Sequence, residues 1–73
     1  MAIIEVKTEI TGVILSILKN AGDNVDEDEP IMTLESMKME IPVAAPESGT
    51  IVEVKVAEEE TVTEGSVVAT IEV

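Results

Sequence analysis

The sequence predicts an all-β domain made of two similar halves, and three observations lead to this prediction. Val, Ile and Thr together supply 27 of the 73 residues, whereas Leu supplies three. Their β-branched side chains are stiff and pack well on a pleated strand. In addition, no window of useful length carries an apolar stripe at the helical period of about 3.6 residues. The third observation is an internal repeat.

This repeat has an offset of 37 residues. When the sequence is shifted by 37 positions against itself, eight of the 36 residue pairs are identical. Two copies are too few for a solenoid, which needs at least three. We therefore expect two halves related by a pseudo-two-fold axis, each completing the core of the other. The identical pairs are Ile4 with Ile41, Val6 with Val43, Gly12 with Gly49, Ile14 with Ile51, Val25 with Val62, Glu27 with Glu64, Thr33 with Thr70 and Glu35 with Glu72.

Each half is expected to form four short strands, because short apolar runs alternate with clusters of turn residues. Alternation is clearest from Val52 to Val56, where valines are expected to face the core and charges the solvent. Segment 13–18 is continuously apolar, which indicates burial on both faces or a bulge. The expected strands are Ile3–Lys7, Gly12–Lys19, a brief strand near Val25, Ile31–Ser36, Met39–Ala44, Thr50–Val56, a brief strand near Val62 and Val67–Val73.

Composition bounds the function. At 73 residues the chain is expected to be a single domain, residues 1–73. Cys, His and all aromatic residues are absent, which removes disulfides, the usual zinc ligands, the usual general base and base-stacking platforms. We therefore predict no catalytic residue, and an enzyme is the least favoured interpretation. A calcium site in the acidic segment 23–29 is disfavoured because the ligand spacing and glycine of a calcium loop are missing.

Charge and hydropathy restrict the partners. The formal net charge is −12, which argues against nucleic acid and anionic membranes. No apolar run approaches the roughly 20 residues that span a bilayer, and the first residues are not typical of a signal peptide. We therefore expect a cytoplasmic protein.

The stretch Glu35-Ser36-Met37-Lys38-Met39-Glu40 lies at the middle of the chain and carries one of its four lysines. Apolar segments 31–34 and 41–43 flank it and read as two strands that meet in a tight turn. Lys38 is then expected at a hairpin tip, with both chain ends at the opposite pole. A covalent attachment site needs an amine held away from the domain in this way. Met37 and Lys38 are poorly suited to the positive φ angles of hairpin turns, so backbone strain is expected there.

The segment Glu35-Ser36-Met37-Lys38-Met39 is similar to the attachment motif of biotin carboxyl carrier domains, in which a lysine between two methionines is biotinylated. Ser36 stands where alanine is more usual, and the protruding "thumb" of some carrier subunits is absent. The resemblance spans the whole chain. Turn residues fall where biotinyl and lipoyl domains carry similar ones, at Gly12, 22–25, 45–46, Gly49 and 62–65.

The resemblance implies a flattened β-barrel (barrel-sandwich hybrid) of two four-stranded antiparallel sheets with quasi-two-fold symmetry. It further implies a carrier with covalent biotin on Lys38, which ferries carboxyl groups between biotin carboxylase and carboxyltransferase components. Because the domain holds no suitable base, a biotin protein ligase has to activate the reaction. Met37, Met39, Glu35 and Ser36 are expected to be recognised by that ligase.

Alternative interpretations remain open at this stage. A lipoyl carrier has the same fold, although Asp-Lys-Ala is usual at its turn, so lipoate is less favoured than biotin. An unmodified interaction module is a third alternative. Met39 and Met37 can also be core residues, since positions two apart on a strand share one face. Asp28 stands opposite Gly65 in the repeat and Glu59 opposite Gly22. The Glu59 turn is the less secure of the two, because Glu tolerates left-handed backbone less well than Asp.

Overall fold

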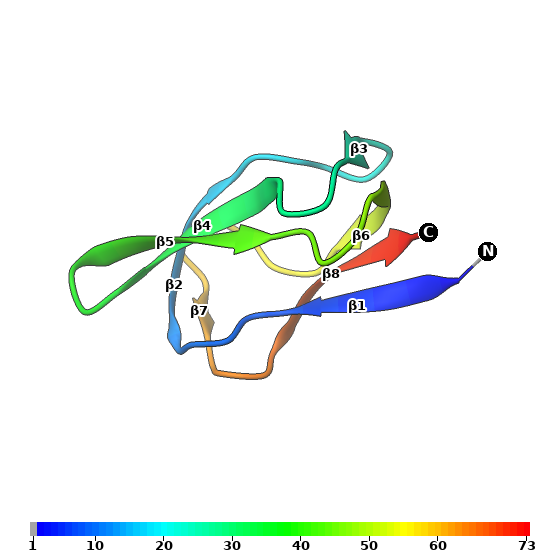
Figure 1. The fold of residues 1–73 in the computed structure, drawn as a ribbon. Coiled ribbons are helices and arrows are strands. Elements are labelled where there is room, and N and C mark those ends of the chain that lie inside the picture. Colours follow the sequence, from blue (N-terminus) through cyan, green and yellow to red (C-terminus); the bar gives the residue numbers. More distant parts are fainter. Residues whose placement is uncertain (1) are drawn as a thin grey trace.

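A computed structural model describes residues 2–73, and the structure is all-β, as predicted (Figure 1). Residues 2–73 contain no helix, and hence none that can cross a membrane. They form eight strands with the following bounds: β1 Ile3–Lys7, β2 Gly12–Ile17, β3 Asn24–Val25, β4 Pro30–Ser36, β5 Met39–Ala44, β6 Gly49–Val54, β7 Thr61–Val62 and β8 Val67–Glu72.

The strands form two four-stranded antiparallel sheets with the orders β1-β8-β6-β3 and β5-β4-β2-β7. A shift of 37 residues converts the first order into the second, strand by strand. The predicted pseudo-two-fold symmetry and two-sheet fold class are therefore confirmed. The molecule is elongated, with extents of 36 × 18 × 17 Å. The β4–β5 hairpin projects at one end, and the described chain ends meet at the other, where Ala2 and Val73 exchange two backbone hydrogen bonds (Figure 1).

The core lies between the sheets and takes matching residues from both halves. Gly12 and Gly49 lie where β2 approaches β4 and β6 approaches β8. A Cβ at Gly12 would meet the carbonyl oxygen of Glu35, and one at Gly49 would meet that of Glu72. Only glycine allows this separation of the strands. The matched buried pairs are Val6 with Val43, Ile14 with Ile51, Val25 with Val62, Ile31 with Val68, Met32 with Ala69 and Leu34 with Ile71.

A β-bulge lies at the same place in each half. The register of β2 shifts between Ile14 and Ser16, and that of β6 between Ile51 and Glu53. Of the two alternatives given for segment 13–18, burial on both faces or a bulge, the structure shows the bulge. The prediction that Val52 faces the core is wrong, since 46% of the residue is exposed. The physical reason is the extra residue, which interrupts the two-residue alternation of the strand.

The two long central strands end earlier than predicted. Strand β2 stops at Ile17 and β6 at Val54, so Lys19 and Lys55 lie just beyond the strands. In the first half, the backbone N–H groups of Leu18 and Lys19 both donate to the carbonyl of Ile31, at 2.8 and 3.1 Å. Two donors on one carbonyl break the regular ladder, and the strand ends there.

Four loop residues with positive φ occur as two symmetry-related pairs. Gly22 (φ 94°) matches Glu59 (φ 73°), and Asp28 (φ 70°) matches Gly65 (φ 88°). The N–H of Gly22 donates to the Ile51 carbonyl at 2.8 Å. The N–H of Glu59 donates to the matching carbonyl, that of Ile14, at 2.7 Å. The Glu59 turn therefore keeps the shape of its glycine counterpart, at the cost of a strained residue.

Candidate functional site

The candidate site is the β4–β5 hairpin, whose two strands pair from Pro30 with Ala44 up to Ser36 with Met39. Only Met37 and Lys38 remain for the turn, with φ angles of 53° and 66°. Two consecutive positive φ angles are the requirement of a type I′ turn, which Asn-Gly satisfies best. The predicted positive φ is confirmed at both residues. A left-handed conformation costs roughly 1–2 kcal/mol for a residue with a Cβ.

The side chains of the turn lie in solvent. Met37 is 91% exposed and Met39 is 63% exposed, and Lys38 is also exposed. The alternative of Met37 and Met39 as core residues is therefore excluded, and Met32 is the buried methionine of the hairpin. Two exposed methionines beside a lysine provide a flexible apolar surface that a partner can contact.

Lys38 differs from the other three lysines in its electrostatic surroundings. Each of the others pairs with a nearby carboxylate: Lys7 with Glu5 at 3.8 Å, Lys19 with Glu29 at 3.0 Å and Lys55 with Glu53 at 3.3 Å. Across residues 2–73, no carboxylate forms an ion pair with Lys38. Its amine is therefore presented without an internal partner.

The base of the hairpin is fixed to the domain body. Glu35 and Glu40 are paired across the two strands and are both exposed, whereas Ser36 is half-buried. The close approach of Gly12 to the carbonyl of Glu35 holds β4 against β2 at this point. The structure thus brings Glu35, Ser36 and the Met-Lys-Met segment together on one projecting element, with a rigid base and an open tip.

The chemistry available here is that of a primary amine. Among the described residues, His, Cys, Asp and Glu form no group of three or more that can hold a metal ion. No imidazole or thiol exists in the sequence to act on the amine. An exposed amine on a turn, with no ion-pair partner among residues 2–73, fits covalent attachment of a group by an external enzyme.

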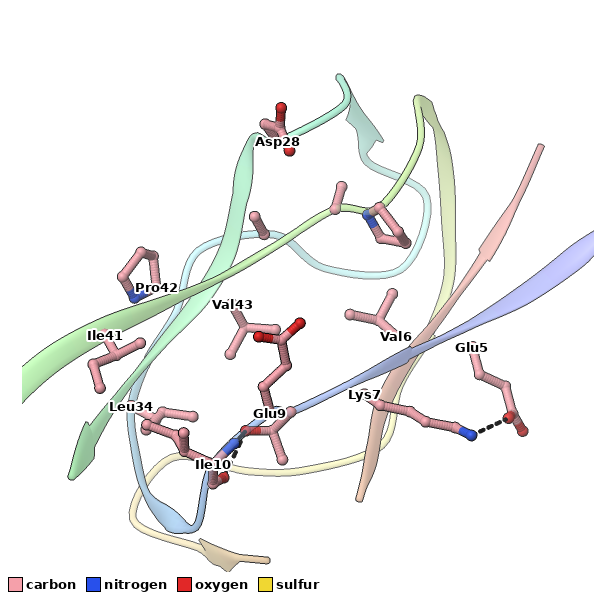
Figure 2. Close-up of a pocket in the computed structure, with 14 residues that line it drawn as sticks. Glu5, Val6, Lys7, Glu9, Ile10, Asp28, Leu34, Ile41, Pro42 and Val43 are labelled. Atoms are coloured by element: carbon pink, nitrogen blue, oxygen red, sulfur yellow. Dashed lines mark hydrogen bonds and ion pairs between the residues drawn. The ribbon is translucent and has the colours of Figure 1, made fainter. Parts of the chain in front are cut away.

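Sequence reasoning missed a groove between β1 and β5, the first strands of the two halves (Figure 2). Its volume is about 420 Å³. Apolar side chains of Val6, Ile10, Leu34, Ile41 and Val43 line it, and the carboxylates of Glu5, Glu9 and Asp28 lie among its other lining residues. The sequence signal available for these two strands was the matched alternation of apolar residues at 4 and 6 and at 41 and 43. That alternation predicts the strands, but it does not reveal that the edges of β1 and β5 are separated by a groove.

A small two-sheet β domain with an unpaired lysine at a hairpin tip has the architecture of a carrier for a covalently attached group. Comparison with known families identifies the class. The family model described as "Biotin-requiring enzyme", which covers biotin and lipoyl attachment domains, matches residues 2–71. The chain belongs to this biotin/lipoyl attachment family, and its role is that of a carrier domain without catalytic activity of its own.

Named relatives and a solved structure agree with this assignment. The biotin carboxyl carrier protein of Streptococcus mutans is 43% identical over 60 residues, covering 82% of this chain and 46% of that protein. The chain thus spans less than half the length of this relative. The biotin/lipoyl attachment protein of Bacillus subtilis is 40% identical over 62 residues, covering 85% of both chains. The Kluyveromyces lactis urea carboxylase structure matches 99% of this chain and 6% of its own, with a TM-score of 0.93 and 26% identity.

Proposed function

We propose that this chain is a biotin carrier in which biotin forms an amide with Nζ of Lys38. The observation that carries the proposal is the exposed Met37-Lys38-Met39 tip, whose lysine has no carboxylate partner among residues 2–73. The methionines favour biotin over lipoate, because the resemblance associates a lysine between two methionines with biotinylation. The S. mutans relative, named a biotin carboxyl carrier protein, supports the same choice.

The attachment step requires an external ligase. The ammonium of Lys38 loses a proton to solvent or ligase, and Nζ then attacks the acyl carbon of a biotinyl adenylate. The new N–C bond forms as the acyl–phosphate bond breaks and AMP leaves. The chain contributes presentation: the type I′ turn places the amine at the tip, and Met37 and Met39 supply apolar contacts on either side. Glu35 and Ser36 flank the turn on β4 and complete the surface that the ligase recognises.

Attachment makes the hairpin a swinging arm between two active sites. When bound, biotin accepts a carboxyl group on its ureido ring and gives it up to an acceptor. The partners proposed are therefore a biotin carboxylase and a carboxyltransferase component, and the match to a carboxylase structure supports this. Tethering to Lys38 keeps the reactive ring at a high effective concentration near both sites. The formal charge of −12 suits basic docking surfaces on these partners.

The experiment is a paired modification assay read by intact mass. The unmodified protein is incubated with ATP and either biotin plus a biotin ligase or lipoate plus a lipoate ligase. We expect complete addition of one biotinyl group and little or no lipoylation. The B. subtilis relative is named for both groups, so lipoylation is the second candidate. Lipoylation without biotinylation would replace the proposal by that candidate, and modification by neither would leave an unmodified interaction module.

A further inference from the structure

The groove between β1 and β5 lies at the foot of the hairpin that carries Lys38. Strand β5 begins at Met39, directly after Lys38, and its residues Ile41, Pro42 and Val43 form one side of the groove. Ile10, in the loop after β1, closes the groove near Leu34 and Ile41 (Figure 2). The end of the groove that lies nearest the hairpin is therefore apolar except for Glu9. We call this end, formed by Glu9, Ile10, Leu34, Ile41 and Pro42, the hairpin end.

Both walls of the groove are strand edges. Each of β1 and β5 is the outermost strand of its sheet and has a neighbouring strand on one side only. An outermost strand directs every second pair of backbone N–H and C=O groups away from its sheet. The groove therefore combines an apolar floor with backbone carbonyls on both sides and backbone N–H donors on the β1 side, because Pro42 leaves β5 without a donor at that position. In Figure 2 the Glu9 side chain extends from beside Ile10 toward Val43 and Val6, which adds a carboxylate acceptor to the groove.

Resting on the proposed function, we propose that the hairpin end of this groove binds the bicyclic ring of the biotin attached to Lys38. The dimensions agree. Eleven bonds join the Lys38 α-carbon to the ring, and these span about 14 Å when extended. Ile41 lies three residue steps after Lys38, which corresponds to about 10 Å along a strand. The volume of about 420 Å³ lies within the range of roughly 300–1,000 Å³ that is usual for small-molecule sites.

The chemical complementarity is specific to a cyclic urea. Its two N–H groups can donate to the Glu9 carboxylate and to strand-edge carbonyls. Its C=O can accept from an edge N–H of β1, since Pro42 on β5 has no N–H to donate. The sulfur-containing ring and the alkyl chain are apolar and suit Ile10, Ile41 and Val43. The dithiolane ring of lipoate has no comparable donors, so the groove discriminates between the two groups. Because the tether gives an effective concentration in the millimolar range, even a millimolar intrinsic affinity keeps the ring bound about half of the time.

The first test compares amide chemical shifts of ¹⁵N-labelled protein before and after biotinylation, with intact mass confirming the modification. We expect shift changes at the turn and also at Glu9, Ile10, Ile41 and Val43. Asp28, which lies away from Ile41 and Leu34 (Figure 2), and its hydrogen-bond partner Ala45 should change little. The lipoylated protein is the matched control and should show changes at the turn alone. If biotinylation changes residues 36–40 alone, the groove does not bind the ring and the inference is overturned.

The second test measures how fast avidin captures the attached biotin. A ring held in the groove is unavailable for capture, so the rate falls in proportion to the free fraction. Because the ring is bound about half of the time, we expect Ile10→Ser and Glu9→Gln to accelerate capture by up to about twofold. The matched control is Ile3→Ser, since Ile3 is 56% exposed and lies outside the groove. Glu9→Gln keeps the inference testable if Ile10→Ser unfolds, because the Glu9 side chain is exposed. Equal capture rates in wild type and both groove variants would overturn the inference.

Different experimental results would overturn the groove site and the proposed carrier function. Biotinylation at Lys38 without any groove response leaves the carrier function intact and removes the groove site. If no ligase biotinylates the protein, the proposed function fails, and the groove is then tested with biotinamide added to the unmodified protein. Shifts at Ile10 and Ile41 at about 5 mM ligand would support the site, and their absence would overturn it.

Discussion

The pseudo-two-fold axis interchanges the two ends of the molecule. The strands pair in the same way at both ends, but the residues that follow the paired strands differ. At one pole β4 pairs with β5, with Glu35 opposite Glu40; at the other β8 pairs with β1, with Glu72 opposite Ile3. The first pair is joined by the Met37–Lys38 turn, whereas the second ends in the described chain ends. The same strand pairing therefore forms without a turn. The comparison teaches that the fold does not depend on the residues of the turn, so their identity has to be explained by function.

The positive-φ residues of the loops and of the turn show the same contrast. In the loops, Asp28 and Gly65 each donate a backbone hydrogen bond to the opposite half, to the carbonyls of Ala45 and Thr8 at 2.8 Å. Their strained conformations connect the two halves. The Met37 and Lys38 side chains, by contrast, lie in solvent. The strain in the loops contributes to assembly of the fold, whereas the strain in the turn contributes to presentation of the amine.

The largest expected effect is a loss of stability at two matched glycines, and it tests whether the two halves contribute equally to core packing. Gly12→Ala and Gly49→Ala should each destabilise the protein by about 3 kcal/mol, because the new Cβ overlaps a strand carbonyl and a core side chain. For a domain of this size, that corresponds to a fall in Tm of roughly 12–24 °C. Thermal unfolding followed by circular dichroism measures both. A loss at one glycine alone would show that the symmetry does not extend to packing energies.

The next effect tests whether the side chains of the Met37–Lys38 turn serve modification and not stability. Replacing Met37 by Asn and Lys38 by Gly gives the residues that a type I′ turn favours. We expect the free energy of unfolding to rise by about 1–2 kcal/mol as the left-handed strain is relieved, while ligase-dependent modification is abolished. Urea unfolding and intact mass are the two measurements. A loss of stability in this variant would mean that the native side chains support the fold.

A smaller effect is expected at the strained loop residue Glu59. Glu59→Gly should raise the free energy of unfolding by about 1 kcal/mol, because glycine adopts the observed φ of 73° without a steric penalty. Gly22→Ala is the matched control at the symmetry-related position, where a Cβ meets no atom within 4 Å but φ is 94°. It should destabilise by a similar amount. If both variants leave stability unchanged, the strain assigned to these turns is absent.

The smallest effect is a difference in pH dependence between the halves. The hydrogen bond from the Asp26 N–H, followed by the contact with Lys19, holds the pKa of the Glu29 carboxyl below its usual value of 4.5. A lowered pKa stabilises the folded state above the unfolded pKa, and this contribution is lost as the pH falls below about 4.5. The matching acceptor in the second half is the hydroxyl of Ser66, which does not titrate.

Glu29→Gln should therefore flatten the fall in stability between pH 5 and pH 3, which are approximate limits set by the usual carboxyl range. Urea unfolding across this range measures the slope. Ser66→Ala is the control and should leave the slope unchanged. Identical slopes for Glu29→Gln and wild type would contradict the role given to the Glu29 carboxylate.

The sequence predicted the features that follow from local patterns. β-Branched content and the 37-residue repeat are sufficient for the strands, the symmetry and the projecting hairpin, because each half repeats the same alternation and turns. The orientation of Val52 was not predictable from alternation, since a bulge shifts the pattern by one residue. The β1–β5 groove was also missed, because the separation of two outermost strands is a property of how the sheets pack.

The central claim is that presentation at the hairpin tip selects Lys38 from four lysines of the same chemistry. Peptide mass mapping after incubation with biotin, ATP and a biotin ligase tests it most directly. We predict one biotinyl group on the peptide that contains Lys38 and none on Lys7, Lys19 or Lys55. The formal charge should change from −12 to −13 as the ammonium becomes an amide. Biotin at another lysine in comparable yield, or an unmodified Lys38, would contradict the claim.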